Sequence, residues 1–290
     1  MNTSIISVDV EDYYQVEAFA RVIHRDAWGT YPSRVEQNTS RLLDLFDQLH
    51  VKATFFVLGW TADHFPRLVR QIVERGHEPA CHSYWHRLVY RLTPDQFRRD
   101  AERAKDAIEQ AAGVQIYGYR APSFSITPSS TWALDILREI GFLYDSSIFP
   151  VRHDVYGFRD APRCPFRLET ACGELLEFPL ATCRLPGGVI LPIAGGGYLR
   201  MLPGWYTKAG VHQAWRDGLT VVSYVHPWEF DPDQPRLNGS IRSRLRHYTN
   251  LGRTEGRLRE LLALGRFTSF RRSGLANFSA PSRLRMAGSQ

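Results

Sequence analysis

The sequence has few cysteines, hardly any lysines and no long apolar run. None of its four cysteines lies in a C-x-x-C pair, which in a chain of 290 residues argues against a disulfide framework. No stretch approaches the ~20 apolar residues that a membrane-spanning helix needs. The N-terminal segment also lacks the basic and apolar regions of a signal peptide. We therefore expect a cytoplasmic protein with reduced thiols and no transmembrane segment, and peripheral contact with a membrane stays open.

The formal net charge of +6 is carried almost wholly by arginine, since lysine occurs only at positions 52, 105 and 208. The arginines are scattered and form no stripe with aromatic residues, which argues against a nucleic-acid partner. They are denser in "IRSRLRHY" and "FRRSG" near the C-terminus. We interpret these segments mainly as solvated surface. Attraction to anionic lipid or to an anionic substrate is the alternative interpretation.

The first half of the chain alternates apolar strands with amphipathic helices. Strands are predicted at 4–10, 52–60, 77–82, 116–122 and 142–147, and helices at 39–50, 65–76, 93–113 and 127–141. Within the longest helix, Thr93 is the expected N-cap and Gly113 the expected C-terminal stop. This alternation predicts a parallel α/β fold, either a sheet or a barrel.

The second half is less regular. Residues 150–215 are rich in Gly and Pro, which break helices and strands. Strands are predicted at 174–180, 218–228 and 267–270, and helical structure at 240–264. With no internal repeat and no clear linker, we expect residues 1–290 to form one elaborated domain.

The stretch "GHEPACHSYWHRL" contains His82 and His86, four positions apart. On one face of a helical turn, two such imidazoles could meet one metal ion. The motif alone is weak, because most such pairs are surface or core histidines. The short strand predicted just before the pair favours the metal interpretation.

Acids crowd the end of the first predicted strand, in "SVDVEDYY". Burial of Asp9, Glu11 and Asp12 together is costly unless positive charge lies beside them. A metal held by two histidines and one acid would keep coordination positions open, as catalytic rather than structural sites do. The simpler interpretation, in which one acid caps a turn and the others are solvated, is less attractive for three acids.

Other polar residues follow later strands. Arg120 could hold a carboxylate ionised and oriented, although a surface arginine is the simpler interpretation. His226 follows an apolar strand and is a candidate general acid, and Asp145 could orient it. The alternatives are a core histidine and a turn aspartate. All these residues fall where parallel strands end, which is where α/β proteins build their sites.

The order of these motifs resembles that of the polysaccharide deacetylases of carbohydrate esterase family 4, which carry the NodB homology domain. The similarity covers about residues 4–150 and 219–230. "SVDVEDYY", "GGGYLR" and "HPWEFDP" resemble the subgroup found with exosortase-associated exopolysaccharide biosynthesis. In that subgroup the region at about 150–290 is a C-terminal extension. The resemblance implies an irregular (β/α) barrel with an elaborated C-terminal region.

The resemblance also implies a role for each matching residue. Asp9 corresponds to the catalytic base, His82 and His86 to metal ligands, Arg120 to the arginine that steers the base, Asp145 to the acid that tunes the catalytic histidine, and His226 to that histidine. The family motif has two adjacent aspartates, whereas this chain has "DVED". Spacing favours Glu11 as the metal carboxylate and side-chain length favours Asp12, so both stay open. The implied cofactor is a divalent metal, with zinc favoured.

The implied reaction is removal of N-acetyl groups from N-acetylhexosamine units of an exopolysaccharide or its precursor, either free or lipid-linked. Three alternatives remain. The chain could act on a small or cyclic amide, it could be a metal-free glycoside hydrolase that uses Asp9 and Glu229, or it could be a non-enzymatic glycan-binding component. Aromatic residues in "GGGYLRMLPGWY" could form a sugar-stacking wall or belong to the core.

Overall fold

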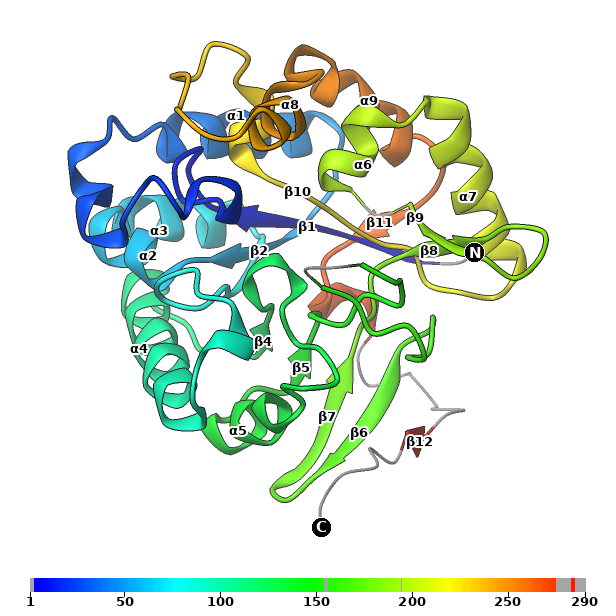
Figure 1. The fold of residues 1–290 in the computed structure, drawn as a ribbon, viewed down its shortest axis with the longest axis horizontal. Coiled ribbons are helices and arrows are strands. Elements are labelled where there is room, and N and C mark those ends of the chain that lie inside the picture. Colours follow the sequence, from blue (N-terminus) through cyan, green and yellow to red (C-terminus); the bar gives the residue numbers. More distant parts are fainter. Residues whose placement is uncertain (1–2, 154–155, 194, 275–282, 285–290) are drawn as a thin grey trace.

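A mostly parallel β-sheet forms the centre of the molecule (Figure 1). In the computed structural model, residues 3–153, 156–193, 195–274 and 283–284 are described. The sheet has ten strands, and its main path runs in the order β10-β1-β2-β3-β4-β5-β7-β6-β12, with β11 beside β1. Among these neighbours only β6 and β7 run antiparallel. The predicted α/β class with parallel strands is therefore confirmed.

The strands are short, apart from the first. They are β1 (Ser4–Val10), β2 (Thr54–Val57), β3 (Glu78–Cys81), β4 (Gly118–Tyr119), β5 (Tyr144–Asp145), β6 (Phe166–Thr170), β7 (Gly173–Glu177), β10 (Val222–Val225), β11 (Phe267–Thr268) and β12 (Arg283–Leu284). A separate antiparallel pair consists of β8 (Thr182–Arg184) and β9 (Ile190–Pro192). Every residue of β1 is buried. A run of apolar, β-branched residues suits such a strand, which is covered on both faces.

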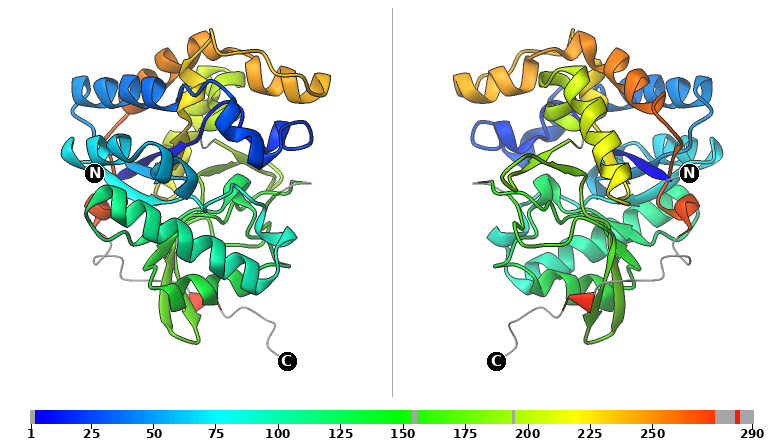
Figure 2. Two further views of the ribbon diagram at one scale, coloured as in Figure 1. Left: turned by 90° about the vertical axis from the view of Figure 1, so that its left-hand side faces the viewer. Right: turned by 90° about the vertical axis from the view of Figure 1, so that its right-hand side faces the viewer.

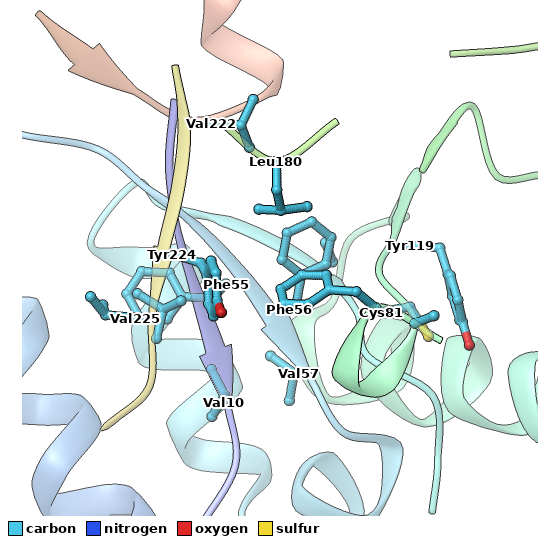
Figure 3. Close-up of a cluster of buried hydrophobic side chains, with 14 of the residues drawn as sticks. Val10, Phe55, Phe56, Val57, Cys81, Tyr119, Leu180, Val222, Tyr224 and Val225 are labelled. Atoms are coloured by element: carbon cyan, nitrogen blue, oxygen red, sulfur yellow. The ribbon is translucent and has the colours of Figure 1, made fainter. Parts of the chain in front are cut away.

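Helices cover the outside of the sheet (Figure 1). They are α1 (Val35–Gln48), α2 (Gly59–His64), α3 (Pro66–Glu74), α4 (Pro94–Ala112), α5 (Trp132–Ile140), α6 (Gly196–Met201), α7 (Gly204–Arg216), α8 (Ile241–Tyr248) and α9 (Thr254–Leu262). Figure 3 shows part of the core that lies between these layers, where side chains of β1, β2 and β10 meet. Among the described residues, no helix is long and apolar enough to cross a membrane.

The chain after β7 links two distant parts of the sheet. Leu180 N donates a hydrogen bond to Ile148 O, just beyond β5, at 3.1 Å, and Ala181 N donates to Val222 O in β10, also at 3.1 Å. The segment therefore passes from the part of the sheet that contains β5 to the part that contains β10. Backbone hydrogen bonds through this segment thus join the β5 and β10 sides of the sheet.

The long helix α4 has the predicted ends. The Thr93 hydroxyl accepts a hydrogen bond from Gln96 N, and the Gln96 side chain accepts one from Thr93 N, which together form a capping box. Gly113 ends the helix in the left-handed conformation, with φ +69°. Both caps are confirmed, because the side-chain chemistry that makes them is local.

Two local predictions were wrong. The strand predicted to reach residue 60 ends at Val57, and α2 begins at Gly59. A Cβ atom at Gly59 would lie 2.7 Å from Ala104 Cα, so glycine here allows α2 to pack closely on α4. Within the region predicted to be irregular, α7 forms directly after Pro203. Proline is tolerated at the start of a helix, where its missing N–H leaves no bond unmade.

Candidate active site

A large cleft opens at the carboxyl ends of the strands. Its volume is about 1220 Å³, and its floor carries Asp9, Glu11, His82, His86 and His226. This volume exceeds the roughly 300–1,000 Å³ of ordinary small-molecule pockets. The cleft lies at the rim where parallel strands present their loops, so the sequence-predicted residues after β1, β3 and β10 come together there.

Glu11, His82 and His86 form a buried cluster. One ligand atom of each lies within 4.8 Å of the other two. Glu11 Oε2 is 2.9 Å from His86 Nε2, yet this buried oxygen makes no hydrogen bond of acceptable geometry within the described part of the chain. A carboxylate and two imidazoles this close together suit a divalent cation, which would replace the Glu11–His86 contact as the partner of Glu11 Oε2. The donor set therefore fits the metal that the sequence predicts.

The two imidazoles and His226 also determine the charge of Glu11. Burial opposes ionisation, but the attraction of His86, His226 and His82 outweighs it and lowers the pKa of Glu11 to about 2. Burial lowers the pKa of His82 to about 4. An ionised carboxylate and a neutral imidazole are the forms that bind metal.

The His82 ring has a defined orientation. Its Nδ1 lies 2.8 Å from the carbonyl oxygen of Arg120. Because a carbonyl oxygen only accepts, Nδ1 carries the proton and Nε2 keeps its lone pair free. Histidines that bind metals are typically held in this way by a backbone oxygen.

The histidine pair does not lie on a helical turn, and that prediction was wrong. The chain after β3 forms a tight loop in which Ser83 and His86 have left-handed φ values of +63° and +50°. Asp100 of α4 stabilises this loop, because its carboxylate accepts hydrogen bonds from Tyr84 N at 2.8 Å and Trp85 N at 3.3 Å. The loop brings the two imidazole centroids to 5.3 Å from each other.

Of the two acids left open for the metal, the structure brings only Glu11 to the histidines. Asp12 Oδ2 accepts hydrogen bonds from Ser33 Oγ at 2.7 Å, Arg34 N at 2.8 Å and Val35 N at 3.1 Å. The two backbone donors, Arg34 N and Val35 N, lie at the start of α1, where N–H groups lack partners within the helix. The Asp12 carboxylate is therefore used to cap α1, and Glu11 is the acid that lies beside His86.

Asp9 is held by Arg120. Arg120 Nη1 donates to Asp9 Oδ1 at 2.7 Å and to Ser7 Oγ at 2.7 Å, and Nε donates to Ser146 O at 3.1 Å. Arg120 is completely buried. A guanidinium that is itself bonded on several sides holds its carboxylate partner in one orientation.

His226 faces both cleft acids. Its Nε2 lies 3.3 Å from Glu11 Oε1 and 4.0 Å from Asp9 Oδ2. Burial alone would lower the pKa of His226, but attraction to Glu229, Glu11 and Asp9 raises it to about 9. The ring is therefore a proton donor beside Glu11 and Asp9 on the cleft floor.

The acid that orients His226 is Glu229, whereas the sequence suggested Asp145. His226 Nδ1 lies 3.1 Å from Glu229 Oε2, which also accepts from His226 N at 2.9 Å. Arg200 of α6 donates to Glu229 Oε1 at 2.6 Å, and both side chains are buried. The local signal was an acid three residues after the histidine, with Pro227 between them, which is a helix-start pattern. Arg200 had no such signal.

Asp145 has different partners. Its carboxylate accepts hydrogen bonds from Ser147 Oγ at 2.6 Å and Ser147 N at 3.1 Å. It also neighbours Glu177 across the β5–β7 pair. Burial, followed by the charge of Asp145, raises the pKa of Glu177 well above its usual range. The raised pKa favours a proton shared between Glu177 and Asp145, and the acid that contacts His226 is Glu229.

The expected aromatic wall does not lie in the cleft. Of the stretch "GGGYLRMLPGWY", Gly197 and Arg200 line the cleft, and Trp205 lines a separate pocket between α7 and α9. The aromatic side chains in the cleft come from other segments: Tyr90, Phe124, Tyr156, Tyr224 and Trp228. Their rings offer flat surfaces suited to sugars.

Two protein-family models divide the chain between them. Residues 25–144 match polysaccharide deacetylase, and residues 146–274 match a domain of unknown function (DUF3473). The peptidoglycan-N-acetylglucosamine deacetylase of Bacillus cereus is 32% identical over 98 residues, which are 33% of this chain and 36% of that protein. The peptidoglycan deacetylase-like protein FGM2 of Gibberella zeae is 31% identical over 122 residues, or 41% of this chain and 35% of that protein. The chain thus spans about a third of the length of these relatives.

The fold has a counterpart among solved structures. A presumed polysaccharide deacetylase from Mycobacterium smegmatis superposes with a TM-score of 0.58 and 24% sequence identity, over 92% of this chain and 85% of that one. At this identity the similarity concerns the fold. It includes the C-terminal half, which the first family model leaves out.

Proposed function

We propose that the protein is a metal-dependent hydrolase that removes N-acetyl groups from N-acetylhexosamine units of a glycan, because residues 25–144 match the polysaccharide deacetylase family. The observation that carries the proposal is the floor of the cleft. There, Glu11, His82 and His86 converge beside the Asp9–Arg120 pair and His226. Relatives described as peptidoglycan and chitooligosaccharide deacetylases support the choice of an acetylated sugar.

Glu11, His82 and His86 would hold the metal, and their donor set of two nitrogens and one carboxylate favours zinc. When bound, the cation would polarise the acetamide carbonyl and lower the pKa of water from 15.7 to roughly 7. The chain's own residues would manage the protons. Asp9, held in place by Arg120, would accept a proton from the attacking water.

His226 would donate a proton to the amide nitrogen, which is a poor leaving group until it is protonated. Glu229 and Arg200 would keep the imidazole turned toward the cleft. A backbone N–H near Ser123, which lines the cleft, would help to stabilise the oxyanion. The products are acetate and a free amino sugar, so a neutral glycan would become cationic.

The substrate and its setting are the finer parts of the proposal. The cleft is large enough for several sugar units, which favours a polymer over a small cyclic amide. The resemblance to the exopolysaccharide-associated subgroup suggests an exopolysaccharide or its lipid-linked precursor, modified in the cytoplasm. We also propose that the two matched segments form a single catalytic domain, since β10 of the second segment pairs with β1.

The alternative glycoside hydrolase would need Glu229 as a free carboxyl. Glu229 is completely buried and its oxygens face Arg200 and His226. Attraction to Arg200 and His226 outweighs burial and lowers the pKa of Glu229 to about 2, so it is unsuited to donate a proton to a glycosidic oxygen.

The deciding experiment is acetate release from N-acetylglucosamine oligomers, measured with purified protein, after chelation and after zinc is restored. Release that stops on chelation and returns with zinc would support the proposal. Asp9→Asn should abolish turnover and keep the metal, whereas His82→Ala should lose both. Full metal content and full activity in His82→Ala would contradict the metal assignment. Release that is insensitive to chelation would favour a metal-free reaction.

A further inference from the structure

The helix α8 exposes aliphatic side chains next to the cleft. Ile241 is 77% exposed and Leu245 is 63% exposed, and their spacing of four residues puts them on the same side of the helix. Val22, on the loop after the short helix η1 (Glu17–Phe19), is 51% exposed. Large aliphatic residues with this exposure indicate a contact surface when they gather in one place.

Packing brings these residues to one edge of the cleft. The Phe19 ring lies 5.0 Å from the His247 ring of α8, and Val22 N donates a hydrogen bond to Phe19 O at 2.9 Å. Val22 lines the cleft together with Arg242 and Arg246 of α8. Figure 2 shows α8 and the N-terminal loops projecting from the same side of the molecule.

Positive charge surrounds the aliphatic side chains. Arg21, Arg242, Arg244 and Arg246 are all exposed. Within the described ranges, Arg21, Arg242 and Arg244 form no ion pair with a carboxylate. The cationic and apolar groups therefore share one surface, which we call the α8 face and define as residues 21–22 and 241–246.

We propose that the α8 face docks the protein on an anionic lipid surface. Arginines attract anionic head groups, and isoleucine and leucine side chains can enter the boundary between head groups and acyl chains. An anionic glycan would account for the arginines alone, because sugars stack on aromatic rings and gain little from branched aliphatic chains. A lipid surface accounts for both kinds of residue.

The inference rests on the proposed function in one respect: docking at this edge would hold the cleft next to a glycan carried on a membrane lipid. The docking itself does not need the chemistry to be correct. The two proposals can therefore fail separately.

The test is co-sedimentation of the full chain with vesicles of phosphatidylcholine alone and of phosphatidylcholine mixed with phosphatidylserine. We expect binding to the anionic vesicles only, weakened by salt. Ile241→Ser with Leu245→Ser, and separately Arg244→Gln, should each weaken binding, with at least a tenfold loss for the double variant. Leu185→Ser with Val189→Ser is the matched aliphatic control, and Arg70→Gln on α3 is the matched charge control. Both controls should bind as the wild type does.

Acetate release from soluble oligomers separates the outcomes. The Ile241→Ser and Leu245→Ser double variant should keep full activity on them, because neither residue lines the cleft. The docking proposal would be overturned if the wild type did not bind anionic vesicles, or if the α8 variants bound them as strongly as the wild type. Vesicle binding without acetate release would support docking and count against the proposed reaction.

Two other occupants of the α8 face are outcomes of the same variants. If Arg244→Gln raised KM for an anionic oligosaccharide and the wild type did not bind vesicles, the α8 face would be a glycan-binding surface. If the aliphatic double variant converted a dimer into a monomer in light scattering, the face would belong to a second copy. Either result would overturn lipid docking.

Discussion

At the scale of single residues, the two neighbouring acids after β1 have different tasks. Glu11 reaches the imidazoles, and Asp12 accepts the hydrogen bonds at the start of α1. Glu11→Gln should therefore lose bound metal and activity while unfolding at nearly the wild-type urea concentration. Metal analysis and urea unfolding on the same preparations measure both effects.

Asp12→Ala is the matched variant. It should keep the metal and lose about 1–2 kcal/mol of unfolding free energy, as expected when a helix start loses its capping side chain. If the two variants exchanged these effects, Asp12 would be the ligand and the assignment of Glu11 would be wrong.

Glu229 is a positioning residue for His226. Glu229→Gln removes the charge that faces Nδ1, so kcat should fall by roughly 10²-fold, within the range that general acid catalysis contributes. KM and metal content should change little, because Glu229 contacts His226 Nδ1 and is not a member of the Glu11, His82 and His86 cluster. Steady-state kinetics with soluble oligomers measure kcat and KM separately.

The control for Glu229 is Asp145→Asn, which should leave kcat nearly unchanged, because Asp145 bonds Ser147 and not His226. Equal losses in both variants would mean that the effect comes through the sheet beneath the site. Partial recovery in Glu229→Asp would support an orienting role that depends on charge.

At the scale of elements, β5 and β7 place Asp145 and Glu177 side by side in the core. Since burial and the neighbouring charge raise the pKa of Glu177, the folded state keeps a proton that the unfolded chain gives up near pH 4–5. The stability that this proton contributes is present below the unfolded pKa and is lost as pH rises through the folded one. The contribution of this carboxyl to wild-type stability should therefore decline as pH rises above its unfolded pKa.

Glu177→Gln tests this linkage. The amide keeps an oxygen for Ile148 N and offers an N–H to Asp145 at every pH. Its unfolding free energy should vary less with pH and exceed that of the wild type at pH 8 by about 1–3 kcal/mol. Urea unfolding at pH 5 and pH 8 measures the difference, and parallel profiles for the two proteins would contradict the shared proton.

The contact between α2 and α4 depends on Gly59. A Cβ atom there would lie 2.5 Å from the Tyr84 side chain and 2.7 Å from Ala104 Cα. Gly59→Ala should lose about 1–3 kcal/mol of stability, as overpacking does. Metal binding should also weaken, because Tyr84 lies in the loop that carries His82 and His86. Gly256→Ala in α9, where a Cβ atom would meet nothing within 4 Å beyond the neighbouring backbone of the helix, should be neutral or stabilising. Thermal unfolding and metal analysis of both variants measure the difference.

At the scale of the whole molecule, the boundary between the two matched segments crosses one sheet. The family models meet near residue 145, but β10 pairs with β1 and carries His226 to the site. We expect residues 1–145 and 146–290 to fail to fold when each is expressed alone. Unfolding of the full chain should be a single transition, with coincident tryptophan fluorescence and circular dichroism. A soluble, protease-resistant fragment 1–145, or two separate transitions, would show that the halves are independent.

The sequence by itself determined the class of fold and most of the site. Apolar periods and caps are local signals, so the alternation of strands and helices and the ends of α4 could be read without coordinates. Because parallel strands end at one rim, residues after β1, β3, β4 and β10 had to meet. This reasoning placed Asp9, the histidine pair and His226 in one cleft, with the buried Arg120 bonded to Asp9.

Only the tertiary structure decided which side chain faces which. A register of one residue separates Glu11 from Asp12, and the donors at the start of α1 take Asp12 away from the metal site. The loop that carries His82 and His86 takes left-handed φ values at Ser83 and His86. Asp100 of the distant helix α4 stabilises it by accepting hydrogen bonds from its N–H groups. Arg200 reaches Glu229 through the packing of α6 beside β10. Such contacts join residues far apart in the chain, and no local pattern specifies them.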